Sequence, residues 1–202
     1  MYEVYPTDSK RIRERIRRYE RLLEQERRRG VLGDGYGKRL LLGPLYMLMG
    51  DVQGALKSFD WYSQTYPDDG GEPYQYLTWA LALWLGNEKI AAFDKLYQTM
   101  LHNIYLVPHL LGENPRQLDL WHGSNWAELE YARELPPSLA DLWDELSLAW
   151  AKGVRNDPRV IAQVDRYIEI HRELKTVAPG PRRSRLVREA SAMRDYSFAF
   201  AE

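Results

Sequence analysis

Cysteine is absent from the 202-residue chain, which excludes disulfide bonds and cysteine-ligated metal sites. No run approaches the roughly 18 consecutive apolar residues of a membrane-spanning helix, and the first residues form no apolar signal segment. An excess of one charge is also lacking, since 28 Lys and Arg oppose 29 Asp and Glu. We therefore expect a cytoplasmic protein with no membrane partner. The 45% of apolar residues can supply a good core.

Catalytic and metal-binding motifs are lacking as well. None of the four histidines is spaced four residues from another, so there is no His-Glu-x-x-His motif. Ser124 lies close to His122, but no Gly-x-Ser-x-Gly elbow surrounds it. The glycine-rich segment 30–37 follows no strand and has no Ser or Thr after the next Lys, which argues against a phosphate-binding loop. We expect no enzyme activity, no metal and no cofactor.

What the chain does have is an ordered pattern of large and small residues between 36 and 106. The positions that carry it are Gly43, Tyr46, Gly50, Ala55, Phe59 and Pro67, with a weaker second copy that includes Ala80 and Ala92. Small residues allow two helices to cross closely, aromatic residues fill the space beside the crossing, and glycine and proline mark the turn and the end. The pattern predicts two helical hairpins, with helices at about 37–49, 52–66, 73–85 and 88–101.

This pattern resembles the tetratricopeptide repeat, a helix–turn–helix unit of about 34 residues. The tryptophan usual near the repeat start is replaced by Arg39 in the first copy. Gly-Pro-Leu-Tyr at 43–46, the run 103–112 and the segment 122–128 also resemble a family of bacterial proteins of similar length, which implies little chemistry. The tetratricopeptide resemblance implies a scaffold for protein–protein interaction and names no partner.

The face of the hairpins that would line a groove is apolar almost throughout. With the Trp-rich loop that follows the hairpins, it provides the predicted protein-binding residues Leu40, Met47, Tyr74, Leu81, Trp84, Trp121 and Trp126. Contiguous apolar patches are rare on soluble monomers, so we favour a groove covered by the chain's own flanking helices over an open one. For the Trp-rich loop we favour a structural role, although tryptophan is enriched in binding hot spots. Self-association stays open.

Positive charge gathers near both ends of the chain. Residues 1–30 hold ten Lys and Arg against six Asp and Glu, and residues 176–202 hold five against three. The alternative function is contact with RNA or DNA through Arg17, Arg27, Arg28, Arg29, Arg182 and Arg183. Acidic residues among the arginines, such as Glu24 four before Arg28, favour instead a solvated helix face with internal ion pairs.

The whole chain predicts an all-α fold of about eight helices in a single globular unit. Residues 1–30 form a basic amphipathic helix, 31–112 the two hairpins, 113–178 a C-terminal cap, and 179–202 a basic helix and tail. The buried face of the first helix is expected to hold Ile12, Ile16, Tyr19 and Leu23.

Three helices are predicted in the cap. One has Asp157 as its cap and Pro158 as its first residue, and it reaches about Lys175. Asn125 and Glu128 suit a capping box for a helix that ends near Glu134. A helix from Ser138 to Lys152 is expected to cover the groove. Its apolar stripe would consist of Leu139, Leu142, Trp143, Leu146 and Trp150.

Overall fold

The computed structural model describes residues 5–30 and 37–198, and every regular element in this part of the chain is helical. Its eleven α-helices are α1 (Ser9–Arg28), α2 (Lys38–Leu48), α3 (Val52–Thr65), α4 (Pro73–Leu85), α5 (Lys89–His102), α6 (Leu106–Leu110), α7 (Leu129–Arg133), α8 (Pro137–Ala140), α9 (Glu145–Arg155), α10 (Pro158–Thr176) and α11 (Pro181–Arg194), with a 3-10 helix, η1 (Asn125–Ala127), before α7. The all-α prediction is confirmed, and the expected number of about eight helices is too low. The interpretation of the glycine-rich segment falls mostly on 31–36, outside the described residues.

The helix expected from Ser138 to Lys152 is divided into α8 and α9. Asp144 causes the division, because its carboxylate accepts hydrogen bonds from the backbone N–H and the hydroxyl of Ser147 at 2.8 and 2.7 Å. A residue that caps in this way begins a new helix, and its own backbone conformation is not helical. Leu146, expected on the buried stripe, is therefore 74% exposed.

The expected capping box of Asn125 and Glu128 does not form. Ser124 caps η1 instead, because its hydroxyl oxygen accepts a hydrogen bond from the backbone N–H of Trp126. Asn103, buried at the end of α5, donates from its amide to the carbonyls of Trp126 and Glu128 at 2.7 and 3.0 Å. With these two bonds the backbone of Glu128 stays extended, at φ −83° and ψ 156°, so a 3-10 turn and the short helix α7 replace one continuous helix.

The helices α2 and α3 pack together, as do α4 and α5, with boundaries within a residue or two of those predicted. Gly43 lies directly against the ring of Phe59. That ring stacks on Trp79 of α4, with centroids 5.0 Å apart, and so joins the two helical pairs. Ala55, Ala80 and Ala92 are fully buried, and Gly50 has a φ of 72° in its turn. The classification of these pairs as tetratricopeptide repeats stays a prediction.

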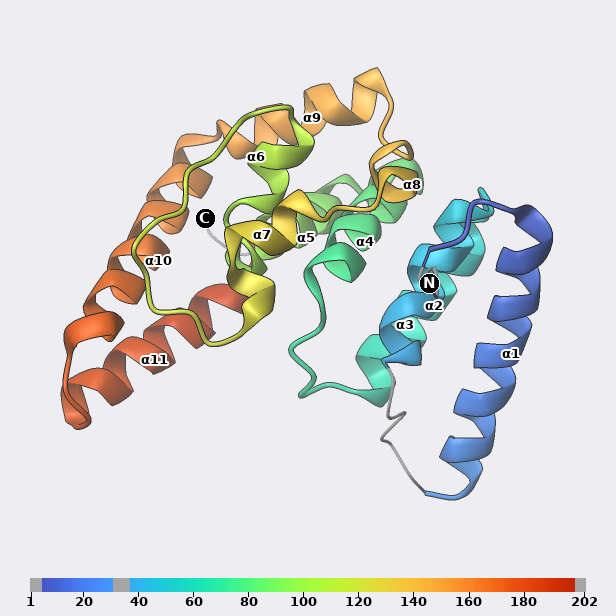
Figure 1. Ribbon diagram of the computed structural model, residues 1–202, viewed down its shortest axis with the longest axis horizontal. Coiled ribbons are helices and arrows are strands. Elements are labelled where there is room, and N and C mark those ends of the chain that lie inside the picture. The colour runs from blue at the N-terminus through green and yellow to red at the C-terminus, as the bar shows by residue number, and fades with distance from the viewer. Residues whose placement is uncertain (1–4, 31–36, 199–202) are drawn as a thin grey trace.

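The helix α1 forms one end of the molecule and lies against α2 (Figure 1). Its buried face consists of Ile12, Ile16, Tyr19 and Leu23, as predicted. These residues form a small core of their own with Leu42 and Leu45. Tyr46 of α2 adds a polar contact, because its hydroxyl donates to the carboxylate of Glu20. α1 is thus a cover for the first hairpin.

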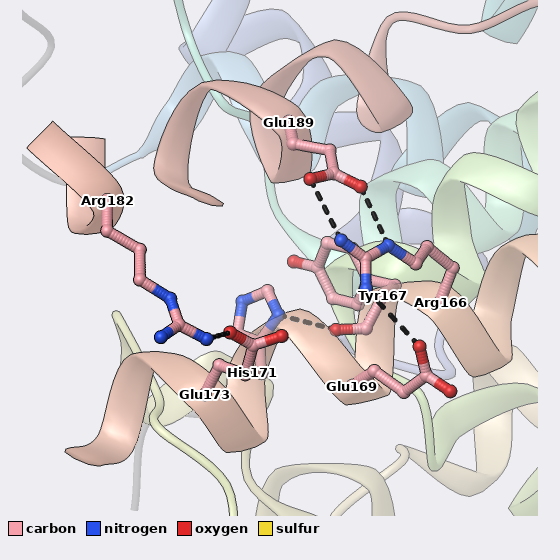
Figure 2. A network of polar contacts seen from close by, with 7 residues as sticks. All are labelled: Arg166, Tyr167, Glu169, His171, Glu173, Arg182 and Glu189. Atoms are coloured by element: carbon pink, nitrogen blue, oxygen red, sulfur yellow. Dashed lines mark hydrogen bonds and ion pairs between the residues drawn. The ribbon is translucent and has the colours of Figure 1, made fainter. Parts of the chain in front are cut away.

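The helices α10 and α11 form the opposite end of the molecule (Figure 1). Arg166 of α10 binds both carboxylate oxygens of Glu189 of α11, at 2.7 and 3.0 Å, and Arg182 binds Glu173 at 2.7 Å (Figure 2). Tyr97 of the central helix α5 donates to the carbonyl of Met193. These contacts fix α11 against both α10 and α5. Across the described residues, no helix combines the length and apolar character needed to cross a membrane.

Candidate functional site

The apolar groove predicted along α2 and α4 is covered over most of its length. Leu40, Met47, Tyr74 and Leu81 are buried, none more than 7% exposed. α8 packs against α2, and Trp150 of α9 stacks on Trp84 with ring centroids 4.6 Å apart. The favoured prediction, that flanking helices cover the groove, is confirmed here. As a correction, Met47 and Leu81 offer a partner no surface, because the chain's own apolar side chains already bury them.

One end of the groove remains open as a cavity of about 850 Å³. α1 and the start of α2 form one wall, and the start of α4, η1 and α7 form the other. Aromatic rings dominate the lining, and they belong to Tyr5, Tyr19, Tyr74, Trp126 and Tyr131. Leu22, Leu40 and Leu41 add aliphatic surface. Of the predicted protein-binding residues, the structure brings Leu40, Tyr74 and Trp126 together here.

The aromatic wall is held in a fixed arrangement. Tyr74 and Tyr131 stack with ring centroids 4.4 Å apart and an interplanar angle of 17°. The Tyr74 hydroxyl also donates to the backbone carbonyl of Tyr131, which locks α4 to α7. Trp126 is 38% exposed, so part of its indole ring faces solvent. A rigid wall of this kind lowers the entropy lost when a ligand binds.

Glu72 is the buried acid of the cavity, with only 6% of its surface exposed. Its carboxylate oxygens accept hydrogen bonds from the backbone N–H groups of Tyr74 and Gln75, at 3.0 and 2.8 Å, and so cap α4. Burial raises the pKa of Glu72 to about 7, against the opposing effect of the two hydrogen bonds. Burial, followed by the nearby charge of Glu72, also raises the pKa of Tyr5. A glutamate directly before Pro73 is a readable capping signal, but no local pattern indicates that its carboxylate is buried.

Charged groups of both signs complete the lining. Arg18 of α1 and Lys38 of α2 lie on one wall, and Glu134 follows α7 on the other. The guanidinium of Arg18 lies 5.3 Å from the ring centroid of Tyr19. The described lining contains no serine, cysteine or histidine that could act with Glu72 as a nucleophile or base. The arrangement suits the binding of a mainly apolar group with polar flanks.

The predicted basic residues are divided between the two ends of the molecule, because α1 and α11 lie far apart (Figure 1). On α1, Arg27 and Arg28 both bind the carboxylate of Glu24, at 2.8 and 2.7 Å. The predicted pair of Glu24 and Arg28 is thus confirmed. Arg29 is exposed at the end of the same helix.

The two basic residues of α11 that were predicted to bind nucleic acid are also engaged. Arg182 pairs with Glu173, and Arg183 donates to the carbonyls of Leu174 and Val177. These two arginines therefore do not join those of α1 in one surface. These contacts hold α11 against α10.

Arg17 lies in a different setting, a shallow hollow of about 560 Å³ on the exposed face of α1. Five arginines line this hollow with Glu14 as its one acid among the described residues. The side chains of Arg11, Arg17 and Arg21 form no ion pair within the described chain. These three arginines lie roughly two to four turns before Arg27.

Trp121 belongs to a second cavity of about 340 Å³, which it shares with Trp126. The predicted Trp-rich loop therefore contributes to two different hollows. Within the described chain, no group of three or more His, Cys, Asp or Glu side chains is placed to hold a metal ion.

The chain matches no protein-family model, no curated protein and no solved structure. Its function is therefore inferred from these cavities and surfaces, and the tetratricopeptide resemblance remains an expectation.

Proposed function

We propose that the protein is a non-catalytic interaction module that binds a short apolar segment of a partner protein in the cavity at the open end of the groove. The observation that carries this proposal is the cavity of about 850 Å³ lined by five aromatic side chains. Its size is that of a binding pocket. Tyrosine and tryptophan are the side chains that most often anchor protein interfaces.

A peptide segment fits the chemistry of this lining better than a uniformly apolar ligand does. Its apolar side chain would contact Leu22, Tyr74 and Tyr131, while its backbone and polar flanks would meet Arg18, Lys38 and Glu134. Amphipathic segments commonly bind helical grooves in this way. The resemblance to tetratricopeptide repeats, which are interaction scaffolds, supports the same proposal.

The test is peptide display on the full chain, followed by titration of the enriched peptides. We expect peptides with one or two large apolar residues to be enriched. Leu22→Glu should weaken their binding about tenfold or more, because it places a carboxylate on the apolar wall. Leu146→Glu is the matched control, since Leu146 is exposed on α9 outside the cavity.

Thermal unfolding of both variants separates lost binding from lost structure. Leu22 is partly exposed, so its replacement should leave the fold intact. Peptides that bind the wild type and Leu22→Glu with equal affinity would contradict the proposal. So would enrichment of peptides without apolar anchors.

A second candidate is phosphate contact with RNA or DNA through the hollow of α1. The observation that favours it is the gathering of Arg11, Arg17 and Arg21 on one exposed face without ion pairs in the described chain. Such a surface gives binding that depends steeply on salt. The net charge of −1 for the whole chain makes this the weaker candidate.

A further inference from the structure

The second cavity differs from the first in its charge. It lies between the end of α5, the loop 121–124, α10 and α11. Arg194, His102, His122 and His171 line it, and no Asp or Glu belongs to its described lining. A concave site that is lined by an arginine and histidines, without a carboxylate in its described lining, favours an anion.

Arg194 differs in its contacts from Arg166, Arg182 and Arg183 at the same end of the molecule. Arg166 and Arg182 bind carboxylates (Figure 2), and Arg183 donates to backbone carbonyls. The side chain of Arg194 makes no hydrogen bond or ion pair within the described chain, and its Nε is buried without an acceptor. A buried donor without a partner is unfavourable, so a ligand that supplies an acceptor is stabilised. Carboxylate and phosphate oxygens match the guanidinium geometry.

Two of the histidines lie close enough to Arg194 to feel its charge. The Nδ1 of His171 faces the carbonyl of Tyr167 at 2.9 Å (Figure 2), and its Nε2 forms no hydrogen bond within the described chain. Both ring nitrogens of His102 face carbonyls, those of Gln98 and Gly70. Burial, and then the positive charge of Arg194, lowers the pKa of both histidines against these hydrogen bonds. A negatively charged group beside them would oppose the effect of Arg194 on their pKa values.

Other charged groups surround the histidines. The positive charge of Lys95 of α5 lowers the pKa of His102 further. The charge of His122 does the same to the pKa of His171. The carboxylates of Asp69 and Asp195 raise the pKa of the Tyr76 phenol, and they do not line this cavity. No carboxylate belongs to the described lining of this cavity, although Arg194 and His102 also border a neighbouring hollow that Asp68, Asp69 and Asp195 line.

A flat apolar surface completes the site. The ring of Trp121 stacks on the imidazole of His171, with centroids 5.9 Å apart and an interplanar angle of 28°. Trp126, Leu101 and Ile104 extend this surface. A small ring could pack here, because aromatic side chains favour stacked contacts with ligand rings.

We propose that this cavity binds a small organic anion, whose carboxylate or phosphate group lies against Arg194 and whose flat ring packs beside Trp121. Recognition combines a charge-assisted hydrogen bond to the guanidinium with burial of the ring. This site is separate from the peptide-binding cavity, and its existence does not depend on the peptide.

The test is calorimetric titration of the full chain with phenyl phosphate, with benzoate and with the neutral analogue benzyl alcohol. We expect at least one anion to bind and benzyl alcohol to bind at least tenfold more weakly. Preference for phenyl phosphate would assign the natural ligand to phosphate esters, and preference for benzoate would assign it to carboxylates. Arg194→Gln should weaken anion binding about tenfold or more, the loss typical for a hydrogen bond to a charged group. Arg188→Gln, on the exposed face of the same helix, should not change it.

A second measurement on the wild type keeps the test valid if Arg194→Gln fails to fold. The indole N–H signals of Trp121 and Trp126, assigned with Trp→Phe variants, should shift in the NMR spectrum on addition of the anion. Two outcomes would overturn the proposal, namely unchanged indole signals with both anions, or equal affinity for the anions and benzyl alcohol. Equal anion binding by folded Arg194→Gln would overturn it as well.

Discussion

Gly43 of α2 lies against the ring of Phe59 of α3, and its lack of a side chain lets these two helices pack together. A Cβ at this position would lie 2.2 Å from the ring of Phe59. That ring cannot move away freely, because it stacks on Trp79 in the next helical pair. The contact therefore links one small residue to the packing of both pairs.

Gly43→Ala should destabilise the chain by about 1–3 kcal/mol, the usual effect of overpacking a core. Gly153→Ala is the matched control, since no neighbouring atom lies within 4 Å of a Cβ in this position of α9. Alanine in an open helical position should stabilise by roughly 0.5–1 kcal/mol. Urea unfolding of both variants measures the two changes. A neutral Gly43→Ala would show that Phe59 can move.

At the scale of single elements, α1 combines two roles on two faces. Its apolar face covers α2. Its exposed side carries arginines, some of which form ion pairs and some of which do not. Arg27 and Arg28 share the carboxylate of Glu24, and Arg17 and Arg21 have no such partner in the described chain. Only arginines without a carboxylate partner are free to neutralise phosphates.

If α1 contacts nucleic acid, the double substitution Arg17→Gln and Arg21→Gln should reduce affinity for single-stranded RNA. The slope of log affinity against log salt should become shallower by roughly two, about one for each lost phosphate contact. The double substitution Arg27→Gln and Arg28→Gln is the control and should change the slope little. Fluorescence anisotropy over a series of salt concentrations measures both. Absence of RNA binding at low salt would remove this function.

The elements show which parts of the fold the sequence could predict. The long helices were predicted correctly because their apolar stripes, caps and prolines are local signals. The short elements were not, because their boundaries depend on distant partners. Asn103 binds the carbonyls of Trp126 and Glu128 across more than twenty residues, and no local pattern reveals this. The cap at Asp144 was local and could have been read from Ser147 three residues later.

At the scale of the whole molecule, the open end of the groove could not be predicted. The sequence indicated an apolar face, but which part of that face the chain itself covers depends on how α8 and α9 pack. The burial of Glu72 and the lack of an ion pair at Arg194 within the described chain follow from the same tertiary arrangement. Of the predicted binding residues, Leu40, Tyr74 and Trp126 line the open end, while Met47 and Leu81 are buried outside it.

The buried carboxylate of Glu72 should affect the stability of the whole chain. Its pKa is raised from 4.5 to about 7, so the folded state binds this proton more tightly than the unfolded state. Its contribution is fully present below about pH 4.5 and is lost as the pH rises through 7, a difference on the order of 3 kcal/mol. His102 and His171 act in the opposite direction, because their pKa values are lowered. Their contribution is present above about pH 6.5 and is lost as the pH falls.

Glu72→Gln removes the Glu72 contribution alone. Urea unfolding between pH 5 and 8 should show that the difference in stability between variant and wild type changes by about 2 kcal/mol, in favour of the variant at high pH. Any constant cost from the altered cap of α4 cancels in this comparison. Glu130→Gln is the control, because the side chain of Glu130 is 69% exposed. Parallel pH profiles for Glu72→Gln and the wild type would contradict the assignment.

Trp126 lines both cavities, so a single indole ring is a common wall of the two proposed sites. A ligand that fixes this ring in one orientation also fixes it for the other ligand. If the two ligands prefer the same orientation, each raises the affinity for the other, and if they prefer different ones, each lowers it. Thermodynamic reciprocity requires the two factors to be equal. The concentration of a small anion would then set how tightly this chain holds a protein partner.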